Sequence, residues 1–306
     1  MARNVLPLAA WLGALLVGCT PEQRARVLID HGSTVGTFRL AMLGSVESLL
    51  DSGRIDAHER VRLDDGVRID TWVLRARNLP EGAESRGTAV LLHGLWDSKA
   101  RFFGLAQRLA GAGFDVILPD NRAHGNSSGQ YITWGAKEKG DVKTVVDTMI
   151  QRHDLSAEVY VVGLSMGGCI AVQYAAHDPR VQGVLAIAPA AGAREVFRRM
   201  FPFSSDASLD EAIEKAGQMA SFQPSQASAV QAASRLRCPL IVVHGRMDMT
   251  VPISHGRAIH RAAAGPKVIH EIPLAGHYTV IVGREAWFAG LVEQLQTRKG
   301  LAKAGA

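Results

Sequence analysis

Ser165 stands between two glycines, at the point where a buried strand is predicted to turn into a helix. Residues 159–176 read VYVVGLSMGGCIAVQYAA, so β-branched residues precede the pentapeptide Gly-Leu-Ser-Met-Gly and small residues follow it. In such a turn, side chains at Gly163 and Gly167 would clash with nearby backbone, and the serine hydroxyl is held out at the sheet edge. The pattern predicts a nucleophilic serine. The alternative is that Gly and Ser are here only as good turn formers.

A serine hydroxyl is a weak nucleophile at neutral pH, and it needs a histidine base and a carboxylate that orients this base. With this kind of turn, the acid and then the histidine follow the serine in the chain. Among the acidic residues that follow Ser165, only Asp248, in LIVVHGRMDMTVP, lies just beyond the end of a predicted buried parallel strand. Catalytic groups collect at such strand ends in open α/β sheets. We therefore expect Asp248 to be the orienting acid, rather than a solvated loop carboxylate.

His277 is the histidine that the same reasoning selects. It lies in LAGHY, after the last predicted strand, and is expected to open the last helix, whereas His255, His260 and His270 fall in helix or strand patterns. Gly276 beside it gives the imidazole room to turn toward the serine. The alternative is a loop or cap histidine. Because all three candidates follow strand ends, they are predicted to meet at one edge of the sheet.

The oxyanion of a tetrahedral intermediate also requires two preorganised N–H donors. Met166, the residue after the nucleophile, supplies one and begins a helix with a positive dipole end. The N–H of Leu95, in the LLHGLWDS loop after the first parallel strand, is the candidate for the other. His93 in this loop is expected to have a structural role. No metal ion or organic cofactor is implied by these residues.

The elements that must position these groups alternate along the chain. Unbroken Val, Ile and Leu runs linked by helical patterns predict a mostly parallel α/β sheet with helices on both faces. Asp65-Gly66, between two alternating segments of 61–76, predicts an antiparallel hairpin at its edge. Strands are expected at 88–94, 114–122, 158–164, 181–189, 239–245 and 267–274, and helices at 98–113, 135–153, 166–178, 253–264 and about 278–296.

One long stretch, residues 191–235, contains no predicted strand. It holds several phenylalanines, among them Phe197, Phe203 and Phe222, and two predicted helices, one of which starts near Ser208. Insertions of this length between strands are commonly functional, so we expect a short helical lid. A purely structural helical excursion is the alternative.

The first residues have the pattern of a targeting segment. Arg3 is followed by an apolar run and then by Leu16-Val17-Gly18-Cys19, which resembles a bacterial lipobox. Residues 1–18 are therefore predicted to be a signal peptide and 19–60 a lipid-anchored spacer with a helix, ahead of an α/β domain at 61–300. Thr20 at the next position looks like outer-membrane sorting. The expected location is the bacterial envelope with Cys19 lipidated, the alternative being secretion after ordinary cleavage.

Composition narrows the class of protein. The chain has 306 residues, of which 47% are hydrophobic and 21% charged, which suits one large α/β core and excludes a disordered chain or a collagen. Its net charge of +5 comes from 34 basic and 29 acidic residues without long runs of one sign, so no nucleic-acid partner is predicted. Cys169 and Cys238 are expected to be small buried side chains rather than a disulfide. The oligomeric state is not indicated.

Together these segments resemble the α/β-hydrolase superfamily, in the branch of serine aminopeptidase-like hydrolases and monoacylglycerol lipases. The resemblance runs from about Thr88 to the end and includes a D-x-R-x-H-G-x-S-x-G segment at 120–129. In such relatives this segment buttresses the nucleophile turn and is not catalytic. Ala123 departs from it, since many members have Gly there.

A serine nucleophile with a complete triad favours acyl transfer, so hydrolysis of small carboxylic esters is expected. Amide or peptide hydrolysis is the first alternative, because the two reactions use the same triad. A catalytically silent envelope lipoprotein that serves as a binding module is the second.

Overall fold

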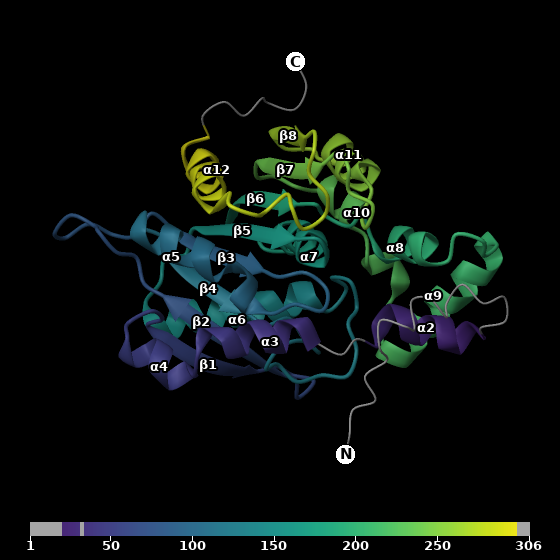
Figure 1. Ribbon diagram of the computed structural model, residues 1–306, viewed down its shortest axis with the longest axis horizontal. Coiled ribbons are helices and arrows are strands. Elements are labelled where there is room, and N and C mark those ends of the chain that lie inside the picture. Colours follow the sequence, from purple (N-terminus) through teal and green to yellow (C-terminus); the bar gives the residue numbers. More distant parts are fainter. Residues whose placement is uncertain (1–19, 31–33, 299–306) are drawn as a thin grey trace.

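The computed structural model describes residues 20–30 and 34–298, and one eight-stranded sheet organises them (Figure 1). The spatial order is β1-β2-β4-β3-β5-β6-β7-β8. The pairs β1–β2 and β2–β4 are antiparallel, and all other neighbouring strands are parallel. The strands are β1 (Ala57–Arg62), β2 (Arg68–Leu74), β3 (Thr88–Leu92), β4 (Asp115–Pro119), β5 (Val159–Leu164), β6 (Val181–Ile187), β7 (Leu240–Gly245) and β8 (Lys267–Ile272). This is the predicted mostly parallel α/β sheet.

The antiparallel edge is the predicted hairpin. Arg62 pairs with Arg68 across the turn, and Gly66 has a φ of 81°, a left-handed conformation that glycine adopts at low cost. Strand β1 begins at Ala57, a few residues before the predicted hairpin segment 61–76.

Helices cover both faces of the sheet because its strands are buried on both sides. In β5, Val159 and Val161 face one core, while Tyr160, Val162 and Leu164 face the other. The first core is covered by α6 (Glu138–His153), α7 (Met166–Ala175), α10 (Ala229–Ala233) and α11 (Ile253–Ala262), and the second by η1 (Lys99–Phe102), α5 (Phe103–Gly111) and α12 (Glu285–Thr297). Cys169 and Cys238 are buried free thiols, as expected, and burial raises their pKa to about 12 and about 11.

The insertion at 191–235 is helical and contains α8 (Ala193–Met200), α9 (Asp206–Ala220), the 3-10 helix η2 (Pro224–Gln226) and α10. Helix α9 begins at Asp206, two residues before the expected start near Ser208, and Ser205 is its N-cap. We call residues 191–235 the lid. Of its phenylalanines, Phe197 is fully buried and Phe203 is 88% exposed.

The helix expected in the N-terminal segment packs on the lid, a partner that its own residues do not specify. Helix α2 (Pro21–Ile29) is capped by Thr20, whose Oγ1 accepts the N–H of Gln23, and it lies beside α9 (Figure 1). Its Leu28 and Ile29 are fully buried, and Arg24 donates a hydrogen bond to Ser208. The short helices α3 (Thr34–Leu43) and α4 (Val46–Asp51) follow before the hairpin.

The last helix begins at Glu285 and not near Tyr278, so His277 lies in a turn-rich loop and does not open a helix. Residues 279–282 (TVIV) are β-branched, and Gly283 follows them with a φ of 66°, both of which disfavour a helix. The signal peptide 1–18 and Cys19 lie outside the described residues. Within 20–30 and 34–298, none of the helices is long and apolar enough to cross a membrane.

Candidate active site

Ser165 occupies a strained turn between β5 and α7. Its φ of 57° and ψ of −115° are unusual for a residue with a side chain and cost on the order of 1–3 kcal/mol. A Cβ at Gly163 would lie 2.1 Å from the carbonyl oxygen of Gly167, and one at Gly167 would lie 2.0 Å from the carbonyl oxygen of Leu92. Both flanking glycines are therefore required by close backbone approach, which is the steric reason inferred from the pentapeptide.

The predicted oxyanion donors lie on two segments next to Ser165. Met166 is the first residue of α7, so its N–H has no acceptor within the helix, and its side chain is fully buried. Leu95 belongs to the loop after β3, and a Cβ at the preceding Gly94 would lie 3.4 Å from the Cβ of Ser165. The structure thus brings this loop alongside the serine.

His93 fixes the start of that loop. Its Nδ1 donates to the carbonyl oxygen of Gly94 at 2.8 Å, while its Nε2 accepts the N–H of Asn121 at 3.0 Å. Complete burial lowers the pKa of His93, so the ring is neutral and carries its proton on Nδ1. It holds backbone on both sides, which matches the structural role expected for it.

Asp248 and His277 are in direct contact. The Nδ1 of His277 lies 2.7 Å from Oδ2 of Asp248, and both residues are about 95% buried, with exposed fractions of 6% and 5%. The Oδ1 of Asp248 accepts the N–H groups of Thr250 and Val251 at 2.9 and 2.8 Å. Burial alone would raise the pKa of Asp248, but hydrogen bonds from His244 and His277 outweigh it and hold this pKa well below its usual range.

The three candidates lie on one edge of the sheet. Leu164 is paired with Ile187 and Ile187 with Val243, so β5, β6 and β7 end in register. Ser165 follows β5 directly, while Asp248 and His277 lie in the loops after β7 and β8. Among the contacts of residues 20–30 and 34–298, no hydrogen bond joins Ser165 to His277. The structure therefore brings the acid and the histidine together and places the serine on their edge of the sheet.

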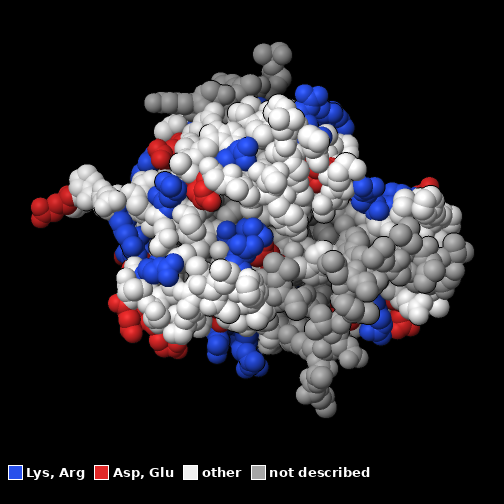
Figure 2. Space-filling view, viewed as in Figure 1, with Lys and Arg blue, Asp and Glu red and all other residues white. Residues whose placement is uncertain are grey.

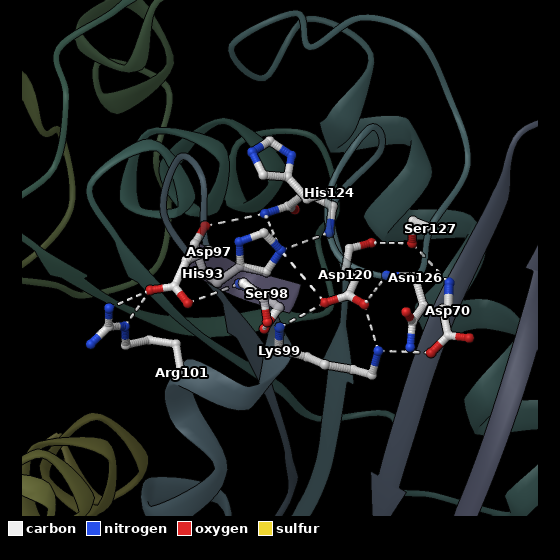
Figure 3. A network of polar contacts seen from close by, with 12 residues as sticks. Asp70, His93, Asp97, Ser98, Lys99, Arg101, Asp120, His124, Asn126 and Ser127 are labelled. Atoms are coloured by element: carbon white, nitrogen blue, oxygen red, sulfur yellow. Dashed lines mark hydrogen bonds and ion pairs between the residues drawn. The ribbon is translucent and has the colours of Figure 1, made fainter. Parts of the chain in front are cut away.

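The segment 120–129 contacts the loop that begins at His93 and holds it in place (Figure 3). Asp120 accepts the backbone N–H of Lys99 at 2.7 Å and that of Asn126 at 2.8 Å, and its carbonyl accepts Ser127 Oγ at 2.7 Å. Since Lys99 starts η1, these contacts fix the loop that carries Leu95. The buttressing expected from the resemblance therefore acts on this loop, one step removed from Ser165.

Ala123 in the same segment has a φ of 60°. This left-handed conformation favours glycine, which the resemblance implies at this position, since a side chain there costs about 1–2 kcal/mol. Nothing in its contacts bears on the site.

His244 is a residue that the sequence analysis missed. Its Nε2 lies 3.5 Å from Oδ2 of Asp248, opposite His277, and its side chain is fully buried on β7. The signal that could have revealed it is a polar residue in the otherwise apolar run LIVVHG, four residues before the acid. Among the described residues, no cluster of three or more His, Cys, Asp or Glu side chains is arranged to hold a metal ion.

Comparisons with known proteins agree with this architecture. The profile of a family described as serine aminopeptidase, S33, matches residues 83–216. The chain is similar to a monoacylglycerol lipase of Mycolicibacterium smegmatis, with 28% identity over 231 residues that cover 63% of this chain and 80% of the lipase. It also resembles Lipase 3 of a Moraxella species, with 35% identity over 92 residues, or 30% of this chain and 28% of that lipase.

Among solved structures, the esterase Pf2001 of Pyrococcus furiosus superposes with a TM-score of 0.64 at 20% identity, over 88% of this chain and 98% of the esterase. At this identity the likeness concerns the fold. The chain therefore has the α/β-hydrolase fold and is similar over residues 83–216 to the serine aminopeptidase S33 family.

Proposed function

We propose that the protein is a serine hydrolase that cleaves carboxylic esters, with Ser165 as nucleophile, His277 as base and then acid, and Asp248 as the group that orients His277. The observation that carries this proposal is the 2.7 Å contact between His277 Nδ1 and Asp248 Oδ2, on the sheet edge where Ser165 sits in a strained turn. An ionised Asp248 keeps the proton of His277 on Nδ1. Its Nε2 is then the ring nitrogen available to take a proton from the serine.

In this mechanism His277 Nε2 takes the Ser165 proton as Oγ attacks the ester carbonyl carbon. The N–H groups of Leu95 and Met166 receive the negative charge that develops on the carbonyl oxygen. When the intermediate collapses, the bond to the alcohol oxygen breaks and His277 protonates the departing alcohol. Water then gives a proton to His277 and attacks the acyl carbon, and the acid leaves as Ser165 regains its proton.

The ester preference is supported by the relatives, since a monoacylglycerol lipase, a lipase and an esterase are among them. The phenylalanine-containing lid is in keeping with an apolar acyl group. The test is turnover of p-nitrophenyl butyrate by the wild type and Ser165→Ala, with the exposed Ser225→Ala as a matched control. We expect Ser165→Ala to lose activity by a factor on the order of a million and Ser225→Ala to lose none. Equal turnover by all three proteins would refute the assignment of Ser165.

Amide hydrolysis is the second candidate, because the family whose profile matches residues 83–216 is described as serine aminopeptidases. Matched substrates with the same acyl group, one a naphthyl ester and one a naphthylamide, decide between the two. Faster release from the amide would replace the ester proposal. A fluorophosphonate probe separates both from a silent binding module, since a module without a reactive serine stays unlabelled.

We also propose that lipidation of Cys19 anchors the protein in the bacterial envelope, a proposal that rests on the sequence of residues 1–19 alone. Cells fed with an alkyne analogue of palmitate test it. The wild type is expected to take up the label and sediment with membranes, and Cys19→Ser to lose the label. If the wild type takes up no label, the proposal is wrong and the alternative, secretion after ordinary cleavage, replaces it.

A further inference from the structure

Exposed apolar side chains gather on the loops around the candidate active site. In the loop after β7, Met247 and Met249 are 58% and 74% exposed. In the loop after β8, Leu274 is 86% exposed, Val282 67% and Tyr278 49%. Large apolar side chains rarely protrude together from a protein that stays in water, so this concentration indicates an interaction surface.

Two further segments continue this surface. Helix α3 exposes Phe38 and Met42, at 69% and 74%, and the lid exposes Phe203 at 88% just after α8. Among the described residues, the large apolar side chains that are strongly exposed all lie on these loops, on α3 or on the lid, except Leu50 in α4. We call the segments 36–43, 94–101, 199–204, 246–250 and 273–284 the rim.

Hydrogen bonds from backbone and arginine groups join the rim segments around the site. The N–H of Met247 donates to the carbonyl oxygen of Ala275 at 3.0 Å, which ties the two strand-end loops together. Arg199 of the lid donates to the carbonyl oxygen of Met249 at 2.9 Å. The lid and the loops of Asp248 and His277 therefore form one continuous part of the rim.

The other side of the rim is joined through Asp97. Arg39 of α3 and Arg101 of η1 both pair with this carboxylate, at 3.3 and 2.5 Å. The guanidinium carbon of Arg101 lies 5.7 Å from the centre of the Tyr278 ring, next to His277. Helix α3, the loop of Leu95 and the loop of His277 are thus neighbours.

The exposed charged side chains within the rim segments are arginines, of which Arg39 pairs with Asp97 and Arg246 lies 3.9 Å from Glu271, two residues before the rim. Its segments contain arginines at 39, 101, 199, 246 and 284, whereas its carboxylates, Asp97 and Asp248, are only 3% and 5% exposed. Lys99, the lysine of the rim, is fully buried against Asp70 and Asp120. Figure 2 shows blue side chains within a broad white area in the middle of one face, with a few red side chains beside them. A partner for such a surface is apolar and carries negative charge.

We propose that the rim docks on an anionic lipid bilayer, so that the candidate active site opens toward the membrane surface. Protruding side chains such as Leu274 and Phe203 enter the boundary between headgroups and acyl chains, and the arginines meet the lipid phosphates. Single protruding residues on several loops suit a deformable lipid surface. The orientation of the active site toward the membrane rests on the proposed function, whereas the docking itself requires no reaction at Ser165.

The deciding experiment places an environment-sensitive fluorophore on Leu274→Cys and, as a matched control, on Ala83→Cys. Ala83 is exposed in the loop between β2 and β3, at the amino end of β3 and thus on the opposite edge of the sheet. Both variants are full-length chains that carry Cys19→Ser, and Cys169 and Cys238 are buried. Because residues 1–19 are the same in both proteins, any affinity of that segment for lipid cancels in the comparison.

With vesicles of phosphatidylcholine and phosphatidylglycerol, we expect the label at position 274 to shift to the blue and to be quenched by nitroxide lipids, and the label at 83 to do neither. Equal responses at both positions would overturn the proposal. So would a blue shift at position 274 that needs no vesicles and grows with protein concentration, since a second copy would then cover the rim. The same contrast is expected in Ser165→Ala, which separates docking from catalysis.

A second measurement uses the variant Leu274→Asp/Val282→Asp against Ala83→Asp. We expect the rim variant to bind the anionic vesicles about tenfold more weakly or worse, because two apolar side chains can no longer enter the lipid. Far-UV circular dichroism and turnover of a water-soluble ester report whether it is folded. Vesicle binding equal to that of Ala83→Asp by a folded rim variant would also overturn the proposal.

Discussion

The Nε2 of His244 lies 3.5 Å from Oδ2 of Asp248, the same oxygen that His277 Nδ1 contacts at 2.7 Å. His244 Nε2 also lies 2.8 Å from the carbonyl oxygen of Val251, so its proton is shared between two acceptors. A Cβ at Gly256 would lie 2.5 Å from His244 Nδ1, which shows how closely α11 confines the ring. The carboxylate is therefore held between two histidines, of which one is fixed in the core.

Replacing His244 tests whether this confinement orients His277. We expect His244→Ala to lower kcat for ester hydrolysis about tenfold with little change in KM, since a hydrogen bond to a charged group is worth about 1.5–3 kcal/mol and this one is long. His260→Gln, on the same side of the sheet in α11, is the control. A merely structural role would lower the free energy of unfolding and leave the kcat of the folded fraction unchanged.

His255 makes the stability of the protein depend on pH. Its Nδ1 accepts the N–H of Ala191 at 3.2 Å, and burial, together with nearby His244, lowers its pKa to about 4. In the unfolded chain a histidine has a pKa of about 6.5. Between these values the unfolded state binds a proton that the folded state does not, so stability falls as the pH decreases from about 6.5 to about 4.

The matching prediction concerns His255→Gln, which keeps an acceptor and removes the titration. Between pH 7 and pH 5, its free energy of unfolding in urea is expected to fall by about 1–2 kcal/mol less than that of the wild type. The exposed His177→Gln is the control. A variant with the same pH dependence as the wild type would show that His255 binds its proton as readily when folded.

Lys99 is expected to be essential for stability. Its Nζ lies 2.7 Å from Asp70 and 2.5 Å from Asp120 and is fully buried. Burial raises the pKa of Asp70, but the charge of Lys99 outweighs it and holds this pKa below its usual value. Lys99→Met leaves two carboxylates in the core without that cation, at a cost of about 3–5 kcal/mol in urea unfolding.

The control for that experiment is Lys143→Met. Lys143 pairs with Asp147 on the surface of α6, where both side chains are more than 40% exposed, so we expect a change within about 0.5 kcal/mol. Similar losses in the two variants would mean that the buried cluster contributes no more than a surface pair.

Features that depend on residues close in the chain could be predicted from the sequence. The hairpin at Asp65-Gly66 and the turn at Ser165 are dictated by neighbouring residues, because each needs glycine at specific positions. Chain order along a parallel sheet likewise put Asp248 and His277 at adjacent strand ends, where they are in contact.

Other features depend on segments far apart in the chain. Helix α2 packs on α9, where Arg24 bonds to Ser208, 184 positions later, and a helix face does not specify its partner. His244 could be recognised as a polar residue in a buried strand, but its contact with Asp248 requires the loop after β7 to fold back. For 278–283, the apolar spacing resembles a helix, while its β-branched residues and Gly283 favour the observed turns.

Replacing alanine by glycine is expected to have opposite effects on the free energy of unfolding at Ala123 and at Ala286. Because its φ of 60° is left-handed, Ala123→Gly is expected to raise the free energy of unfolding by about 1 kcal/mol. The same change at Ala286, exposed in α12, is expected to lower it by about 1 kcal/mol, since glycine gains freedom in the unfolded chain and loses it in a helix. Urea unfolding of both variants measures the difference. If Ala123→Gly is as destabilising as Ala286→Gly, the segment 120–129 does not hold residue 123 in the left-handed conformation.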